Sequence, residues 1–353
     1  MNNTKTLLAL LSGSLAASVA HAQVEITITG STAFRSISID RSAALYDAGS
    51  RSSITNDATT GLITFSGTMS NKVASLGSTP VKVRLSFSGS ASGMLSVKNS
   101  TPVSTAETAG VNVNKIPDLA LSDVFPSSAT PPISDNSFNR AILGVIPFLW
   151  VKNNALSGIV NITREQAVLL FTASGEGGMP ATYLGGSSSN PVYLIGRDPG
   201  SGTRITVHKD VGFNSLPTYW ATNGAGMYVQ TNGYSSGGLQ RGTIAAKSDA
   251  IGYLGRADLL VVSASVSAIS YEGVAFSPAA VTSGKYPIWG YEHIVNRAGG
   301  LSANQVSVRN ALIAAITDAA FQATPVYSDN FVSLSDMEVE RGTDGGTITS
   351  ILF

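Results

Sequence analysis

The chain has 353 residues, of which 43% are hydrophobic and 12% charged, with no cysteine and a formal net charge of zero. This length exceeds what one hydrophobic core usually serves, so we expect two lobes. The lack of cysteine excludes disulfides, thiolate metal sites, thiol nucleophiles and a lipoprotein anchor, and a neutral chain without Lys/Arg clusters argues against nucleic acid or an anionic membrane surface as partner.

The first 22 residues have the pattern of a secretory signal peptide. Lys5 supplies a positive start, residues 7–19 form a short apolar run, and residues 20–22 (Ala-His-Ala) form a small-x-small cleavage site. The run is too short for a spanning helix. We therefore expect a mature chain that begins at Gln23 and is periplasmic or secreted.

Strands and turns alternate in the first half of the mature chain. Residues 24–29 alternate apolar and polar side chains, which predicts a strand that runs into Gly30-Ser31-Thr32, and a helix is compatible with 34–45. Residues 81–87 predict a second strand, which ends at a turn over 88–93. Residues 145–151 are nearly all apolar, as in a buried strand.

The second half continues the same alternation. Thr163 to Gln166 is a capping-box pattern that predicts a helix start, and strands are expected at 192–195 and 250–254. A second capping box, Ser302 to Gln305, precedes an amphipathic helix whose apolar positions extend to Phe321. Strands alternating with helices indicate an α/β fold. Residues 48–80 and 98–115 are polar and predict surface excursions or hairpins without assigned chemistry.

Three short turns rich in glycine and hydroxyl groups follow predicted strands, at 30–32, 88–93 and 200–203. Glycine lets backbone N–H groups turn inward, and a following helix adds the positive end of its dipole. Serine and threonine hydroxyls can donate to oxyanion oxygens. One such turn is weak evidence, but three in one chain predict a site for a small anion.

Two charged residues accompany these turns. Arg197 lies four residues before Ser201 and can offer forked donors to a tetrahedral anion; alternatively it forms a surface ion pair with Asp198. Asp123 ends a predicted strand, where it can accept a hydrogen bond from a protonated ligand and reject sulfate, or serve as a helix N-cap. The sequence leaves these alternatives open.

At these residues the chain resembles the periplasmic phosphate-binding proteins of ABC transporters and the wider PBP-like domain family. The similar segments occur in the family's order over roughly 23–47 and 81–325, and they are Gly30-Ser31-Thr32, Gly89-Ser90-Ala91-Ser92-Gly93, Asp118 to Asp123, Arg197 to Thr203, Ala250-Ile251-Gly252-Tyr253 and Thr282 to Pro287. The most specific are the arginine followed by Ser-Gly-Thr and the Ile-Gly-Tyr strand. One departure is that Pro199 stands where the family commonly has an acid, which leaves the orientation of Arg197 open.

The resemblance implies a type II periplasmic-binding-protein fold, in which two α/β lobes are joined by two crossover strands around a ligand cleft. It places lobe 1 at 23–138 and 260–353 and lobe 2 at 139–259, after a signal peptide at 1–22. The ligand residues that it implies are Ser31, Thr32, Ser90, Asp123, Arg197, Ser201, Gly202 and Thr203. The implied role is capture of phosphate or a similar oxyanion for uptake, with an ABC transporter permease as possible partner. We expect a monomer with no cofactor, no metal and no catalytic residue.

Two rival functions remain open on the sequence. The protein could be a secreted anion-scavenging or surface module that meets no transporter. Gly233-Tyr234-Ser235-Ser236-Gly237 also matches the G-x-S-x-G pattern, with Asp258 and His293 following in the chain order of an α/β-hydrolase. No HGGG-type oxyanion motif precedes that match, which disfavours a serine hydrolase.

Overall fold

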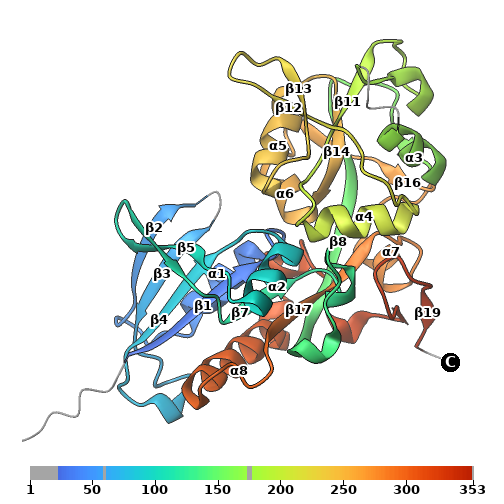
Figure 1. Cartoon of the computed structure of the whole chain (residues 1–353). Coiled ribbons are helices and arrows are strands. Elements are labelled where there is room, and N and C mark those ends of the chain that lie inside the picture. The colour runs from blue at the N-terminus through green and yellow to red at the C-terminus, as the bar shows by residue number, and fades with distance from the viewer. Residues whose placement is uncertain (1–22, 59–60, 173–176, 352–353) are drawn as a thin grey trace, which may run out of the picture.

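The computed structural model describes residues 23–58, 61–172 and 177–351. The predicted signal peptide lies outside these residues. Figure 1 shows the described chain as two α/β masses connected by long strands. The predicted α/β class is therefore confirmed.

Each mass is built on parallel strands. Lobe 1 is the part around β1 (Val24–Gly30), β4 (Val81–Ser86) and β7 (Leu119–Ser122), in which β1 lies between the other two and runs parallel to both. Lobe 2 is the part around β11 (Pro191–Ile195) and β14 (Ala250–Gly255), which are also parallel. These strands lie where the sequence predicted them, because runs of Val, Ile and Leu bounded by turn residues favour buried strands.

One mixed sheet runs through both lobes. Its other strands are β2 (Ser52–Asp57), β3 (Leu62–Gly67), β8 (Phe138–Asn153), β10 (Met179–Pro180), β15 (Val266–Ala268) and β17 (Trp289–Arg297). The order is β10-β11-β14-β8-β17-β7-β1-β4-β3-β2, and β15 also pairs with β8. Small two-stranded sheets are formed by β5 (Val103–Thr108) with β6 (Val111–Lys115), β9 (Asn161–Ile162) with β16 (Ser270–Tyr271), β12 (Tyr219–Thr222) with β13 (Tyr228–Thr231), and β18 (Val339–Glu340) with β19 (Thr349–Ser350).

The two lobes are joined by β8 and by the chain entering β17. The first half of β8 pairs with β17, whereas its second half pairs with β14 and β15. The change occurs at Pro147, which lies opposite Trp289. The lobe boundaries at 139 and 260 stay predictions. Because β15 pairs with β8 and β16 pairs with β9, we propose that the chain instead passes from one lobe to the other near Pro147 and Pro287.

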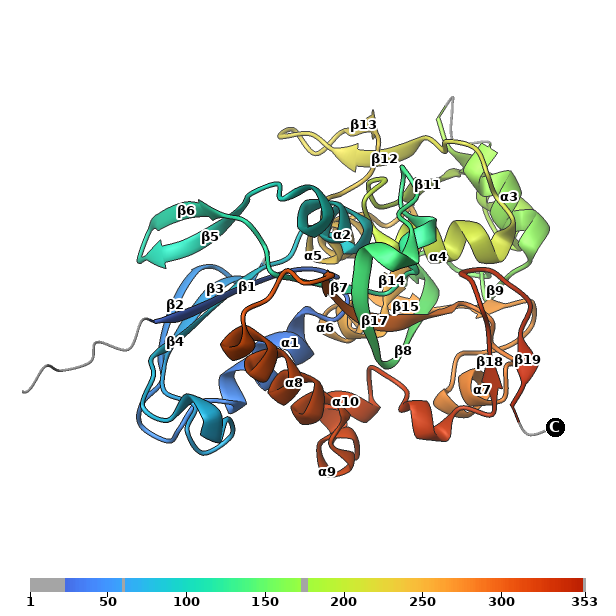
Figure 2. The same ribbon diagram turned by 60° about the horizontal axis from the view of Figure 1, so that its bottom comes forward.

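Helices cover the faces of the sheet. They are α1 (Arg35–Ala44), α2 (Ser90–Asn99), α3 (Arg164–Thr172), α4 (Gly202–Val211), α5 (Gly237–Ala246), α6 (Arg256–Val261), α7 (Pro278–Thr282), α8 (Ala303–Thr317), α9 (Ala319–Gln322) and α10 (Pro325–Ser328). Short 3-10 helices lie at Ala74–Leu76, Pro126–Ser128, Asp135–Ser137, Ala181–Leu184 and Leu334–Asp336. Figure 2 shows α1 and α8 on one face of the lobe 1 sheet and α2 with the β5–β6 hairpin on the other.

Local signals explain where these helices begin and end. Before α8, the Ser302 hydroxyl accepts from the backbone nitrogen of Gln305, and the Gln305 side chain accepts from the backbone nitrogen of Ser302. This is the predicted capping box. The helix was predicted to continue to Phe321, but it ends at Thr317 because Asp318 leaves the helical conformation and caps α9 instead.

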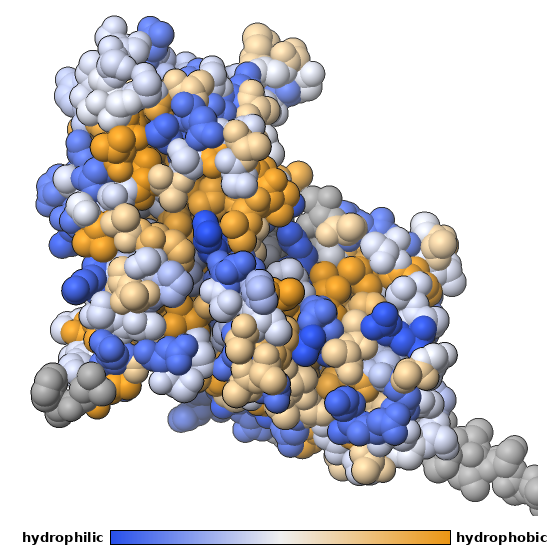
Figure 3. All heavy atoms as spheres, turned by 180° about the vertical axis from the view of Figure 1, so that it is seen from behind, coloured by the Kyte–Doolittle hydropathy of each residue, from blue (hydrophilic) through white to orange (hydrophobic). Residues whose placement is uncertain are grey.

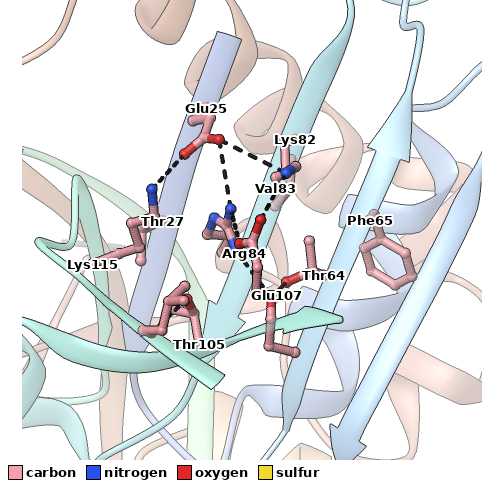
Figure 4. Close-up of polar contacts among 12 residues, drawn as sticks. Glu25, Thr27, Thr64, Phe65, Lys82, Val83, Arg84, Thr105, Glu107 and Lys115 are labelled. Atoms are coloured by element: carbon pink, nitrogen blue, oxygen red, sulfur yellow. Dashed lines mark hydrogen bonds and ion pairs between the residues drawn. The ribbon is translucent and has the colours of Figure 1, made fainter. Parts of the chain in front are cut away.

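The two polar stretches without assigned chemistry contain hairpins, β2–β3 and β5–β6. An ion-pair network holds the second hairpin against the sheet (Figure 4). The buried Arg84 of β4 contacts Glu107 of β5 at 2.5 Å and Glu25 of β1 at 3.5 Å, and Lys115 of β6 lies 3.2 Å from Glu25. The Arg84 guanidinium also donates to the Ala106 carbonyl at 3.0 Å. The β5–β6 hairpin is therefore an anchored part of lobe 1.

The outer surface mixes polar and apolar residues. Figure 3 shows, from behind, a notch where the two lobes diverge. None of the helices in the described residues has both the length and the apolar character that crossing a membrane requires.

Candidate functional site

The site lies where the ends of parallel strands meet. Because β7, β1 and β4 run parallel side by side, the turns that follow them emerge at the same edge of the lobe 1 sheet. These turns contain the predicted residues Asp123, Ser31 and Ser90, in that order. In lobe 2, the parallel strands β11 and β14 likewise bring Arg197 and Asp258 to one edge.

Asp123 is the centre of the lobe 1 half. Its side chain is 1% exposed, and its two carboxylate oxygens accept from the hydroxyls of Ser31 at 3.0 Å and Ser90 at 2.6 Å. Burial raises the pKa of Asp123, while the two hydroxyls and Arg197 act in the opposite direction. No cap role is seen, because the next helical turn begins after Phe125. The N-cap alternative for Asp123 is therefore wrong.

The backbone fixes Ser31 in this position. The nitrogen of Ser31 donates to the Leu121 carbonyl at 2.8 Å, and its hydroxyl oxygen accepts from the nitrogen of Phe34 at 3.2 Å. Gly30 precedes it with a φ of 112°, and a Cβ at that position would overlap the Leu121 carbonyl. Glycine is thus required for the turn to pass so close to β7. Thr32 follows in the same turn and is also buried.

The lobe 2 half is the turn before α4. Ser201 is the N-cap of this helix, and its hydroxyl accepts from the nitrogen of Arg204 at 3.3 Å. Gly202 and Thr203 form the first turn, where backbone N–H groups lack helical partners and the helix dipole is positive. Ser201 and Thr203 are 1% and 3% exposed, so this end of the helix is enclosed by protein.

Arg197 is buried beside this turn. Its side chain donates from Nε to the Tyr234 carbonyl and from Nη2 to the Ser235 carbonyl, each at 3.0 Å. Burial lowers the pKa of Arg197, and Asp198 is the strongest of the charges that oppose this shift. Arg197 and Asp198 form no ion pair in the described structure, and one Asp198 oxygen is buried without a hydrogen-bond partner. The alternative of a surface ion pair between them is therefore wrong.

The two halves touch. The nitrogen of Ala91 in α2 donates to the carbonyl oxygen of Gly200 at 3.1 Å. A Cβ at Gly202 would overlap Asp123 Oδ1 and lie 2.7 Å from the Ser90 hydroxyl. The structure thus brings Ser90 and Asp123 of lobe 1 directly against the start of α4. All eight predicted ligand residues are buried.

Other charged residues at the lobe junction were not predicted. Arg35, in the first turn of α1, lies 3.9 Å from Asp258 of α6, and Arg241 of α5 pairs with the same carboxylate at 2.5 Å. Glu292 of β17 is 0% exposed and interacts electrostatically with Asp123. Because Arg35 lies only three residues after Thr32, the sequence could have indicated that it is near the site. Nothing in the sequence links Glu292 to Asp123.

The geometry does not form a hydrolase triad. Ser235 is exposed and precedes the N-cap of α5, and Asp258 is engaged by Arg241. Both ring nitrogens of His293 are buried without hydrogen-bond partners, so this histidine neither activates a serine nor is oriented by an acid. Burial lowers the pKa of His293 to about 3, which keeps the ring neutral. The described residues also contain no cluster of His, Asp and Glu suited to a metal ion.

Known proteins resemble this chain as follows. No family model matches it. The phosphate-binding protein PstS of Bacillus subtilis is 27% identical over 194 residues, which cover 54% of this chain and 57% of that protein. A Clostridium perfringens structure described as a phosphate ABC transporter substrate-binding protein with bound phosphate superposes with a TM-score of 0.58 at 15% identity, covering 88% of this chain and 99% of the other. An ABC-type phosphate transport receptor from Vibrio cholerae superposes with a TM-score of 0.52 at 16% identity, covering 87% and 99%.

These likenesses bear on the fold. The chain spans little more than half of its sequence relative, whereas the structural matches extend over nearly the whole of the solved chains. At this identity they establish architecture rather than chemistry. The predicted type II periplasmic-binding-protein fold is confirmed.

Proposed function

We propose that this chain is an exported solute-binding protein that captures one small tetrahedral oxyanion, most of all phosphate, between its lobes for uptake by an ABC-type transporter. The observation that carries this proposal is Asp123, a buried carboxylate held by two hydroxyls and facing the start of α4. The proposed ligand residues are Ser31, Thr32, Ser90, Asp123, Arg197, Ser201, Gly202 and Thr203.

The donors suit an anion and the carboxylate selects among anions. The start of α4 offers backbone N–H groups and a positive dipole, and Arg197 adds a formal charge. Asp123 opposes any anion that has no proton to give. Hydrogen phosphate has a P–OH group that can donate a hydrogen bond to Asp123, whereas sulfate has no such donor. A site that requires a hydrogen bond from its ligand rejects an analogue that lacks it.

The proposed role in transport is supported by the descriptions of similar structures and by the signal-peptide pattern. The two structural neighbours with the higher TM-scores are described as a phosphate ABC transporter substrate-binding protein and an ABC-type phosphate transport receptor. The signal-peptide pattern of residues 1–22 supports export. We therefore propose a periplasmic or secreted binding protein that delivers its anion to a permease as a monomer.

Calorimetric titration of the mature protein with phosphate, arsenate, sulfate and molybdate tests the proposal. We expect one site per chain for phosphate and arsenate, and binding of sulfate weaker by at least about a hundredfold. Asp123→Asn replaces the acceptor with a group that can also donate. The variant should bind phosphate more weakly, and the difference between its phosphate and sulfate affinities should be smaller than in wild type. Equal affinity of wild type for phosphate and sulfate, or no phosphate binding, would contradict the proposal.

A further inference from the structure

A second carboxyl group lies behind Asp123. Glu292 belongs to β17, whose next residue, His293, pairs with Ser122 at the end of β7 in an antiparallel register. The ladder ends at that pair, and Asp123 is the next residue of the chain after β7, with its backbone carbonyl against Gly290 of β17 and its carboxylate close enough to interact electrostatically with Glu292. The two carboxyl groups therefore belong to one cluster, formed by two different strands.

The surroundings of Glu292 do not support a negative charge. Its side chain is 0% exposed, and neither carboxyl oxygen has a hydrogen-bond partner of acceptable geometry in the described structure. An ionised carboxylate without donors is strongly disfavoured in a protein interior. Burial and the neighbouring charge of Asp123 raise the pKa of Glu292 well above its ordinary value, although the Ser31 hydroxyl and the Ser122 backbone act in the opposite direction.

Asp123 and Glu292 differ in their hydrogen-bond donors and in the charges near them. Asp123 accepts two hydroxyl hydrogen bonds and feels the positive charge of Arg197, whereas Glu292 has no cation against it. When two interacting carboxyl groups have unequal environments, the one with more hydrogen-bond donors and a nearby positive charge ionises and the other keeps the proton. Glu292 is the member of the pair that keeps it.

We propose that Glu292 is a proton-bearing positioning residue of the anion site, which stays neutral at neutral pH and donates a hydrogen bond that keeps Asp123 ionised as the acceptor for the ligand. This inference rests on the proposed function and names the group that sets its selectivity. Without the donor, Asp123 takes up a proton more readily. A protonated Asp123 donates to sulfate instead of repelling it, so discrimination is lost.

The pH behaviour follows from the groups that face Glu292. These are Asp123 and the backbone of Ser122 at the end of β7, Ser31 after β1, and Tyr327 of α10. Burial raises the pKa of Tyr327 as well, so its phenol remains neutral. Loss of the Glu292 proton at alkaline pH places a second negative charge beside Asp123. Affinity for phosphate then falls, although the ligand itself stays a dianion.

Two substitutions separate the donor from the bulk of the side chain. Glu292→Gln keeps a neutral hydrogen-bond donor, and Glu292→Leu keeps only the volume. At neutral pH the ratio of phosphate affinity to sulfate affinity should stay within about threefold of wild type in the Gln variant. In the Leu variant this ratio should fall by at least about tenfold. At alkaline pH the Gln variant should lose less phosphate affinity than wild type.

Infrared spectroscopy of the wild-type protein with isotope-labelled glutamate provides a readout that needs no stable variant. We expect a neutral carboxylic acid band at neutral pH, and its absence from the Gln variant confirms the assignment. A folded Leu variant with an unchanged affinity ratio overturns the inference, as does a fully ionised glutamate spectrum. If wild type binds no oxyanion, the proposed function fails, and the band still decides whether Glu292 carries a proton.

Discussion

The backbone nitrogen of Ala91, in the first turn of α2, donates to the carbonyl oxygen of Gly200, and these two residues belong to different lobes. The three predicted glycine-rich turns are therefore not independent surface turns, since two of them touch. One free N–H group of α2 is satisfied by protein rather than by solvent. The structure thus represents a closed arrangement of the lobes at this point.

Substitution of Gly202 by alanine tests how closely the lobes approach. A Cβ there would overlap the Asp123 carboxylate and crowd the Ser90 hydroxyl, so the lobes must separate or Asp123 must shift. Because the clash exists only when the lobes are closed, we expect phosphate affinity to fall by at least about thirtyfold, or about 2 kcal/mol. Calorimetric titration measures the loss.

Gly224→Ala is the matched control. No atom lies within 4 Å of a Cβ at this position, so binding should stay within about twofold of wild type. Thermal unfolding of both ligand-free variants checks that neither is grossly destabilised. A Gly202→Ala protein that binds as tightly as the control would mean that the lobes do not close in this way.

Replacement of Ser235 by alanine addresses the hydrolase alternative. The Ser235 hydroxyl is not part of a triad, and only its backbone carbonyl, which alanine retains, accepts from Arg197. We expect phosphate affinity within about twofold of wild type and no hydrolysis of activated esters by either protein. Turnover that disappears in Ser235→Ala would show a catalytic role for this residue.

The sequence predicted the strands and turns of the site because their signals are local. The strand predicted at residues 24–29 and the Ser302 capping box depend only on neighbouring residues, and both occur as predicted. Parallel pairing then fixes which turns share an edge. Local signals located the turns, and the family resemblance supplied the full set of eight ligand residues, whose role as ligands stays a prediction.

What sequence reasoning missed depends on long-range register. Glu292 reaches Asp123 only because β17 pairs with β7, although residues 123–288 separate the two strands, and Arg35 reaches Asp258 only when the lobes meet. The predicted helix extending to Phe321 failed for a local reason: Asp318 is a good N-cap, and its side chain accepts from the Phe321 nitrogen at 2.9 Å. Apolar spacing alone could not reveal that break.

Acid should destabilise the protein partly through His293. Its pKa is about 3 in the folded state and 6.5 in the ordinary state, because burial and Arg140 disfavour the charged ring. Between these values the unfolded chain binds a proton that the folded chain does not. The free energy of unfolding therefore falls as pH decreases through this window.

The size of this effect can be measured with His293→Phe, which preserves the edge contact to Phe125. Near pH 4.5, about two units below the ordinary pKa, His293 should cost wild type about 3 kcal/mol. The variant should lose correspondingly less stability between pH 7 and that pH in denaturant titrations. His208, whose pKa burial also lowers to about 3, should add to the acid sensitivity in the same pH window. Equal pH slopes for variant and wild type would mean that His293 ionises normally.

Arg197 should contribute more to anion binding than any single hydroxyl. Its guanidinium is buried and oriented by the carbonyls of Tyr234 and Ser235, so the charge is already fixed before the ligand arrives. Removing one partner of a buried charge pair costs about 2–5 kcal/mol, which corresponds to a loss of roughly thirty- to several-thousand-fold for Arg197→Ala. Thr203→Val should cost about tenfold at most, because one neutral hydroxyl contributes about 0.5–1.5 kcal/mol.

Arg197→Lys separates charge from geometry. An ammonium keeps the positive charge but cannot donate to both carbonyls and to the ligand from one rigid plane, so it should restore only part of the affinity. The alanine variant also leaves two carbonyls without their donor, and its stability in the absence of ligand must therefore be measured alongside binding. Calorimetric titration of the folded variants with phosphate decides the matter. An Arg197→Ala protein that binds within about threefold of wild type would show that Arg197 only braces the Tyr234–Ser235 segment, and the positive charge of the site would then have to come from the start of α4 alone.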